Sequence, residues 1–166
     1  AERVRGPDDQ GHRGWQWNAL HDAGGRSLEL IHPGMPNDQG QNWASSDVPQ
    51  GTPGSANSVA SSDIAPIITD VRQSILIPSS SDAVTITAHL RDESTGPLAA
   101  SLFYRVDGTG GPFSELVMAD DGLHGDGGVG DTTFGATIPE QADGTIVEFY
   151  VRALDPGSNA RTWPAP

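Results

Sequence analysis

Four aspartates stand close together in one glycine-rich stretch, residues 120–131, which we call the acidic loop. They are Asp120, Asp121, Asp126 and Asp131, and five glycines lie among them. Glycine readily adopts positive φ, so the backbone can turn back and bring several carboxylates to one point. Converging carboxylates repel one another unless a cation lies between them, and hard oxygen ligands favour Ca²⁺. The stretch therefore predicts a calcium site with Asp120, Asp121, Asp126 and Asp131 as candidate ligands. Asp121, Asp126 and Asp131 recur five residues apart and are the favoured three, together with a backbone carbonyl.

The acidic loop has a second interpretation without a metal. Its spacing differs from that of an EF-hand, which needs Asp-x-Asp-x-Asp-Gly and a closing Glu. Aspartates in turns also accept hydrogen bonds from nearby backbone amides, and a solvated turn that caps itself has the same composition. The sequence leaves both interpretations open.

Histidine is the other residue type here that could do chemistry. His124 lies among the carboxylates, and an Asp/His pair can transfer protons. No nucleophile or pocket pattern accompanies it, and His12, His21, His32 and His89 are scattered without a zinc spacing. The chain has no cysteine, which excludes thiolate catalysis and cysteine-bound zinc. We expect a protein that is not an enzyme.

Three tryptophans in the first third of the chain form a candidate ligand platform. Trp15, Trp17 and Trp43 could stack on sugar rings, although aromatic side chains of a small domain more often pack in its core. Tyr150 is a candidate for the tyrosine corner of immunoglobulin-like folds, in which its hydroxyl bonds to upstream backbone.

Charge and composition limit the partners. The formal net charge is −13, from 22 acidic and 9 basic residues, which argues against nucleic acid and anionic membrane surfaces. No apolar run is long enough to span a bilayer, so no membrane insertion is expected. The start at Ala1 rather than Met favours a piece cut from a longer precursor.

Residues 65–166 predict an all-β domain. Turns rich in Gly, Pro and Asp separate runs that alternate apolar and polar side chains, which is typical of strands. About seven strands in roughly 100 residues indicate an antiparallel β-sandwich of the immunoglobulin or fibronectin type III kind. The expected strands are 67–71 with 74–77, 83–90, 100–106, 113–119, 132–138, 145–154 and 160–163.

Residues 1–57 predict a smaller β segment, and residues 58–64 a linker. The segment has too few apolar residues for a core of its own, and its clearest strand is 27–31. A partial sheet would expose strand edges and an apolar face. We therefore expect this segment to pack on the domain that follows it.

Two resemblances add to this interpretation. Residues 14–57 resemble the C-terminal end of a bacterial lamin-tail domain, through Trp17-Asn18, Asp22-Ala23-Gly24-Gly25, Ser27-Leu28-Glu29-Leu30-Ile31, Gln41-Asn42-Trp43 and Gly51-Thr52-Pro53-Gly54. In that family these segments close an immunoglobulin-like sandwich, whose earlier strands are missing here.

Residues 65–166 resemble the Ig-like repeats of large bacterial surface proteins, which commonly accompany lamin-tail and CotH-like kinase domains. The matching segments are Tyr104-Arg105-Val106-Asp107, Met118–Asp126, Gly130-Asp131, Ile138-Pro139 and Val147–Ala153. Those repeats commonly read Asp-Asp-Gly-x-x-Gly-Asp-x-x-x-Gly-Asp at the acidic loop. The resemblance implies an architecture more than an activity.

Together these features predict a non-catalytic, extracellular Ig-like module of a larger bacterial surface or secreted protein. It would space or dock neighbouring domains of the same polypeptide, or adhere to a cell-surface protein or glycan, with calcium as a candidate stabilising cofactor. The alternative is a calcium-dependent carbohydrate-binding module.

Overall fold

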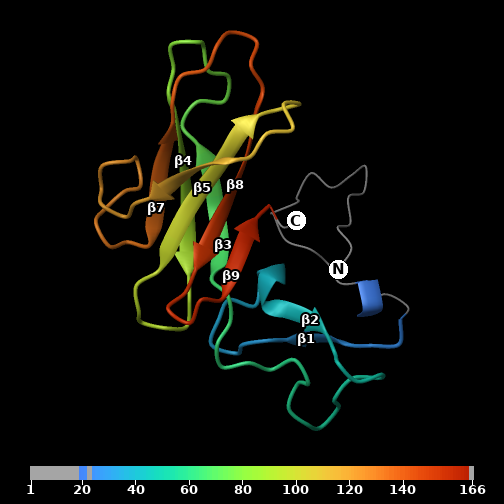
Figure 1. Ribbon diagram of the computed structural model, residues 1–166. Coiled ribbons are helices and arrows are strands. Elements are labelled where there is room, and N and C mark those ends of the chain that lie inside the picture. The colour runs from blue at the N-terminus through green and yellow to red at the C-terminus, as the bar shows by residue number, and fades with distance from the viewer. Residues whose placement is uncertain (1–18, 22–23, 165–166) are drawn as a thin grey trace.

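The computed structural model describes residues 19–21 and 24–164. The regular secondary structure of this part of the chain is almost entirely β-strand, joined by long loops, with two single-turn 3₁₀ helices, η1 (Ala19–His21) and η2 (Gly40–Asn42) (Figure 1). Trp15 and Trp17 lie outside the described residues. Within the described residues, no helix has the length and apolar character needed to cross a membrane.

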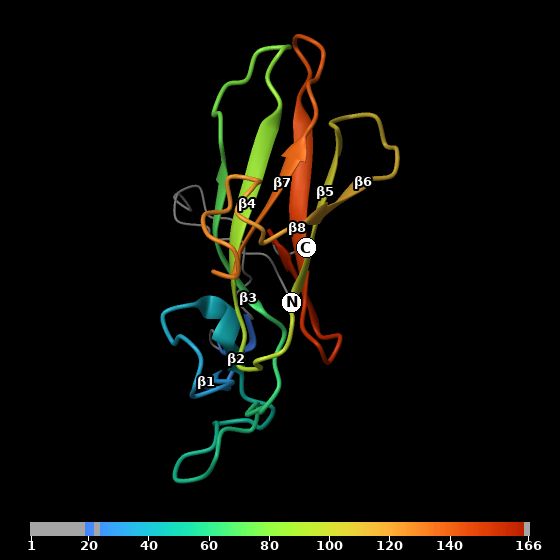
Figure 2. The same ribbon diagram turned by 90° about the vertical axis from the view of Figure 1, so that its left-hand side faces the viewer.

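Two antiparallel sheets form a sandwich, which confirms the predicted fold class (Figures 1 and 2). Figure 2 shows β4 and β7 on one side and β5 and β6 on the other. Within the described residues, one sheet has the order β3-β4-β7 and the other the order β6-β5-β8-β9. Their bounds are β3 (Ile67–Gln73), β4 (Val84–Arg91), β5 (Ala99–Val106), β6 (Ser114–Met118), β7 (Thr133–Ile138), β8 (Val147–Leu154) and β9 (Ala160–Trp163).

Alternation along the strands builds the core between these sheets. Side chains at every second position of β4 and β8 point inward, and the opposite positions face outward. Full burial of a Leu, Ile or Val side chain contributes about 1.5–3 kcal/mol, so this shared face supplies most of the stability. The buried core comprises Ile68, Ile86, Ala88, Leu90, Ala100, Leu102, Met118, Phe134, Ala136, Ile138, Val151 and Ala153.

The first strand of the sandwich differs from its prediction. β3 continues through residues 72–73, and its irregularity is a bulge between Thr69 and Arg72, where Asp70 has a φ of 49°. Ser74 still bonds to Thr85 of β4, but residues 75–77 leave the sheet, and Leu76 and Ile77 are 83% and 91% exposed. The sequence pattern was misleading because a run of three apolar residues, 75–77, looks like a strand whether or not a partner strand is present.

The N-terminal unit is a two-stranded ribbon organised around one buried carboxylate. Its strands β1 (Leu28–Leu30) and β2 (Trp43–Ser45) pair antiparallel. Glu29 is only 5% exposed and accepts hydrogen bonds from the hydroxyls of Ser27 (3.1 Å), Thr52 (2.6 Å) and Ser58 (2.8 Å), and from the Ser58 amide (2.7 Å). These donors join β1 to the later loop of the unit.

The pKa of Glu29 makes the unit sensitive to acid. The Thr52 hydroxyl is the largest cause that lowers this pKa from 4.5 to about 2; burial opposes it, and the Ser58 and Ser27 donors support it. Because the folded pKa is depressed, the stabilisation is present above about pH 4.5 and is lost as the pH falls towards 2.

Glu29→Gln is expected to lower the melting temperature by several degrees at pH 7. The NH₂ group of glutamine cannot accept hydrogen bonds, so some of the hydroxyl and amide donors around it would lose their acceptor. The substitution should also remove part of the pH dependence of unfolding between pH 4.5 and 2. Thermal unfolding over a pH series measures both effects. Glu115→Gln, on the exposed side of β6, is the control, and equal curves for the two variants would contradict this role of Glu29.

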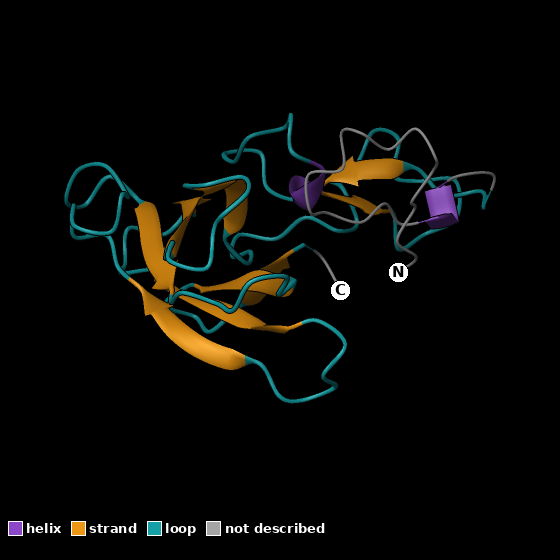
Figure 3. Ribbon diagram, turned by 90° about the horizontal axis from the view of Figure 1, so that it is seen from above, coloured by secondary structure: helices purple, strands orange, loops and turns teal. Residues whose placement is uncertain are grey.

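The N-terminal unit, which contains both 3₁₀ helices, lies beside the sandwich (Figure 3), and its contacts are with the start of β3. The side chain of Gln41 donates to the Ile68 carbonyl (2.7 Å) and accepts from the Ile68 amide (2.9 Å). Met35 is buried with Ile64 and Ile67, and Ile31 packs against them. Gln41 thus occupies the place of a neighbouring strand at the β3 edge, which leaves that stretch closed to other chains.

Arg161 of β9 closes the same junction from the other sheet. Its guanidinium donates to the carbonyls of Pro66 (2.8 Å) and Ala65 (3.1 Å), in the segment that leads into β3. Burial lowers the pKa of Arg161 to about 10, so it remains charged at neutral pH. The junction is therefore fixed by contacts to both sheets of the sandwich.

Candidate functional site

The acidic loop connects the two sheets, running from β6 to β7 at the left of Figure 1. After β6, Ala119 forms a bridge with Gly135 of β7, so the chain changes sheets before the loop begins. The loop then folds back over the outer face of β7. A Cβ on Gly135 would lie 2.4 Å from the His124 carbonyl oxygen, so glycine at this position permits the close packing.

Asp126 is the centre of the loop. It is 1% exposed, and its carboxylate accepts the amides of Asp121 (2.7 Å), Gly122 (3.0 Å) and His124 (3.1 Å). Burial acts to raise the pKa of Asp126, but the backbone hydrogen bonds outweigh it and the pKa lies below its usual value. The amides of this turn are not paired by strand hydrogen bonds. The ionised Asp126 carboxylate accepts three of them in place of water.

The other three aspartates cap amides at the rim of the loop. Asp120 accepts the amides of residues 130 (2.8 Å), 131 (3.2 Å) and 132 (2.9 Å). Asp131 accepts those of residues 128 (2.8 Å) and 133 (2.9 Å), which hold its pKa below the usual value. Asp121 accepts the amide of residue 123 (2.9 Å). Each carboxylate is therefore turned towards the backbone of its own loop.

This arrangement bears on the predicted calcium site. Asp121, Asp126 and Asp131 do not converge on one point, and within the described residues no group of three or more acidic or histidine side chains is placed to hold a metal ion. Of the carboxylate oxygens that calcium would need, all but Asp121 Oδ2 already accept amide hydrogen bonds. The geometry favours the self-capping turn, and calcium binding stays a prediction.

The calcium prediction has a direct test. From this geometry we expect the melting temperature to be the same in 1 mM Ca²⁺ and in EDTA. A ligand that binds only the folded state at a hundredfold excess over Kd would add about 2.7 kcal/mol, a shift of several degrees. Such a rise, if lost in Asp131→Asn, would establish the metal site and contradict the geometric interpretation.

The Asp121–His124 pair is the one place in the loop where proton transfer could be considered. The two side chains lie 2.9 Å apart and are 40% and 42% exposed. The His124 side chain is the largest cause that lowers the pKa of Asp121, followed by the amide of Leu123. The structure places the pair at the loop surface, where its contacts stabilise the turn.

The structure bears on two predictions about aromatic residues, the tryptophan platform and the corner tyrosine. Trp43 lies in β2, half-buried, and its indole donates to the Asn37 carbonyl (2.8 Å). With the other two tryptophans outside the described residues, the platform is not placed. Tyr150 lies on the outer face of β8 and its ring stacks on Phe103, with ring centroids 4.7 Å apart, so its position is not that of a corner tyrosine.

Sequence reasoning missed two polar residues, Asn42, which holds the N-terminal unit together, and Gln41, which joins that unit to the sandwich. Asn42 is fully buried; its side chain accepts the His32 amide (2.9 Å) and donates to the carbonyls of His32, Met35 and Pro36. Its neighbour Gln41 reaches the sandwich. One feature of the sequence could have indicated their role. The Gln-Asn pair stands beside Trp43 in a unit that has too few apolar residues to be held by packing alone.

Comparison with known proteins identifies no relative. No protein-family model matches the chain, and no curated protein matches it.

Proposed function

We propose that this chain is a non-catalytic module of a larger secreted or cell-surface protein, whose role is to hold two neighbouring units of that protein in a fixed arrangement. The observation that carries the proposal is the buried double hydrogen bond between Gln41 and Ile68. In a flexible tether such a contact would often break, and each buried group left without a hydrogen-bond partner would cost free energy. A buried polar contact across the junction therefore favours a fixed arrangement.

Two further contacts support the fixed arrangement, and a third feature stiffens the sandwich itself. The apolar cluster around Ile67 includes Met35 of the first unit, so the junction contains a small core of its own. Arg161 ties the connecting segment to the opposite sheet. The self-capped acidic loop lies against the outer face of the sandwich, which stiffens a long connection without adding a pocket for chemistry.

The lamin-tail and Ig-like resemblances fit the same role. They suggest a bacterial surface protein as the context, and the strong negative charge suits an exposed module that stays soluble.

Calorimetry of the whole chain tests the fixed arrangement. We expect one unfolding transition, with equal calorimetric and van't Hoff enthalpies, because the two units share buried contacts. Two separate transitions would show that the units unfold independently and would contradict the proposal.

A further inference from the structure

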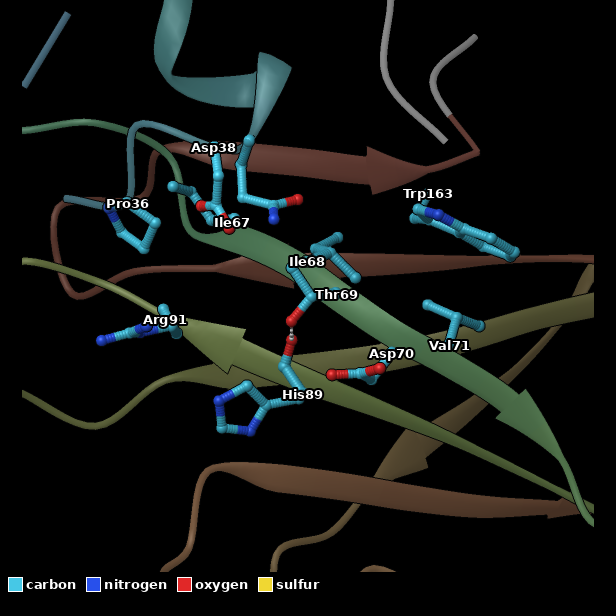
Figure 4. A pocket seen from close by; sticks show the side chains of 11 residues that line it. Pro36, Asp38, Ile67, Ile68, Thr69, Asp70, Val71, His89, Arg91 and Trp163 are labelled. Atoms are coloured by element: carbon cyan, nitrogen blue, oxygen red, sulfur yellow. Dashed lines mark hydrogen bonds between the residues drawn. The ribbon is translucent and has the colours of Figure 1, made fainter. Parts of the chain in front are cut away.

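A polar cleft lies where the N-terminal unit meets the outer face of β3 and β4 (Figure 4). Its volume is about 460 Å³, within the range of small-ligand sites. Pro36 and Asp38 of the N-terminal unit form one wall, β3 and β4 form the floor, and Trp163 of β9 stands at the far end. The cleft is therefore built from three separate parts of the chain and exists only while the units are docked.

The β3 bulge supplies the most distinctive group in this cleft. Asp70 has a φ of 49°, a left-handed conformation that is uncommon for a residue other than glycine. Bulges re-aim side chains and are frequent beside binding sites. Asp70 follows Thr69, which is the partner of His89 across the sheet, and the Asp70 carboxylate is 64% exposed beside the cleft.

The hydrogen-bonding groups of the cleft are mixed in kind. Asp38 and Asp70 can accept and Arg91 can donate. The Thr69 hydroxyl donates to the His89 carbonyl (3.4 Å), so towards a ligand it accepts, and the His89 ring, whose Nδ1 lies 3.5 Å from the Thr133 hydroxyl, keeps its other nitrogen for a ligand. Val71 and Trp163 add apolar surface at one end. Such a set suits a ligand that carries many hydroxyls and also an apolar face.

Charge narrows the ligand further. Two carboxylates and the Arg91 guanidinium line the cleft, and Asp70 also pairs with the Arg72 guanidinium (3.3 Å), so the charges at the cleft balance and favour a neutral ligand. The net charge of −13 on the whole chain further disfavours an anionic one. We propose that this cleft binds a neutral pyranose sugar, with Asp38 and Asp70 accepting its hydroxyls and the Val71 and Trp163 end meeting its C–H face. The proposal needs the docked arrangement but no calcium.

The test is an NMR titration of the ¹⁵N-labelled chain with the methyl glycosides of glucose, galactose, mannose and N-acetylglucosamine. At least one is expected to bind with a Kd of about 1 mM, as a ligand of this size commonly does. Its amide shifts should centre on Thr69, Asp70 and His89. The same titration is repeated with the corresponding free sugars. If a free sugar binds more weakly than its methyl glycoside, the natural ligand is the end of a glycan chain. If both bind equally, the natural ligand is a free sugar.

Two variants and a control make the test specific. Asp70→Asn keeps a residue that tolerates the left-handed conformation and should weaken binding about tenfold, as should Asp38→Ala. Asp143→Asn, in the exposed loop before β8, should bind like the unchanged chain.

Binding by none of the four glycosides, or equal binding in Asp70→Asn, overturns the sugar site. The Ile68 amide signal in the same spectra reports whether the units are docked. A docked chain that binds no sugar therefore refutes this proposal and leaves the proposed function intact.

Discussion

Replacing Asp126 by asparagine is expected to lower the melting temperature by roughly 5–10 °C, one of the two largest effects we expect from a single substitution in this chain. The carboxylate is 1% exposed and accepts three amides of its loop. Asparagine keeps the shape but replaces one oxygen by an NH₂ group, which then faces amide donors. Buried amides that lose their acceptor carry the full cost of desolvation.

The matched control for this effect is Asp131→Asn, which removes a carboxylate from the same loop at an exposed position. Water can replace the lost acceptor there, so a fall of at most a few degrees is expected. Amide exchange should accelerate at residues 121, 122 and 124 in the Asp126 variant alone. Equal melting temperatures for the two variants would show that burial of Asp126 contributes nothing.

The Asp126 variant also has a pH signature. The folded pKa of this carboxyl lies below its usual value, so its stabilisation is present at neutral pH and is lost on acidification. The difference in stability between the unchanged chain and Asp126→Asn should therefore shrink as the pH falls below the usual aspartate range. Melting curves of both proteins between pH 7 and 2 measure this difference.

Replacing Gln41 by alanine should cost about 2–4 kcal/mol in the free energy of unfolding, because it leaves both the amide and the carbonyl of Ile68 without partners in a buried position. Part of that loss can be recovered if the N-terminal unit separates and water reaches the β3 edge. The variant is therefore expected to show two transitions in calorimetry where the unchanged chain shows one.

Gln41→Glu separates the hydrogen bonds from the size of the side chain. The carboxylate can still accept from the Ile68 amide, but its second oxygen faces the Ile68 carbonyl, which it repels. We expect destabilisation at neutral pH comparable to that of Gln41→Ala. Chemical denaturation of both variants measures the effect, and a Gln41→Glu protein as stable as the unchanged chain would show that the double hydrogen bond is not needed.

The sandwich could be predicted from the sequence because its signal is local. The alternation of Ile86, Ala88 and Leu90 in β4 and of Val151 and Ala153 in β8 follows from the two-residue period of a strand, whatever lies around it. The β3 bulge could not be predicted, because nothing about an aspartate at position 70 requires a positive φ until its neighbours fix the backbone.

The acidic loop illustrates a limit of another kind. Four aspartates among glycines are equally suited to surround a cation or to cap their own amides, since both roles use the same oxygens. The choice depends on the direction each carboxylate faces, which the folded backbone of the whole loop sets and its composition does not. The docking of residues 1–57 could be expected from their small apolar content, but its polar contacts from Gln41 join residues 27 positions apart, beyond the reach of local patterns.

Hydrogen exchange at the Ile68 amide tests the central claim, the fixed docking of the N-terminal unit, most directly. This amide lies at the edge of β3, and its hydrogen-bond partner is the side chain of Gln41. If the units form one rigid body, the Ile68 amide should be as strongly protected as the Leu90 amide in β4 and should open only with global unfolding. Exchange at Ile68 that is orders of magnitude faster, while Leu90 stays protected, would show that the N-terminal unit separates on its own and would contradict the account.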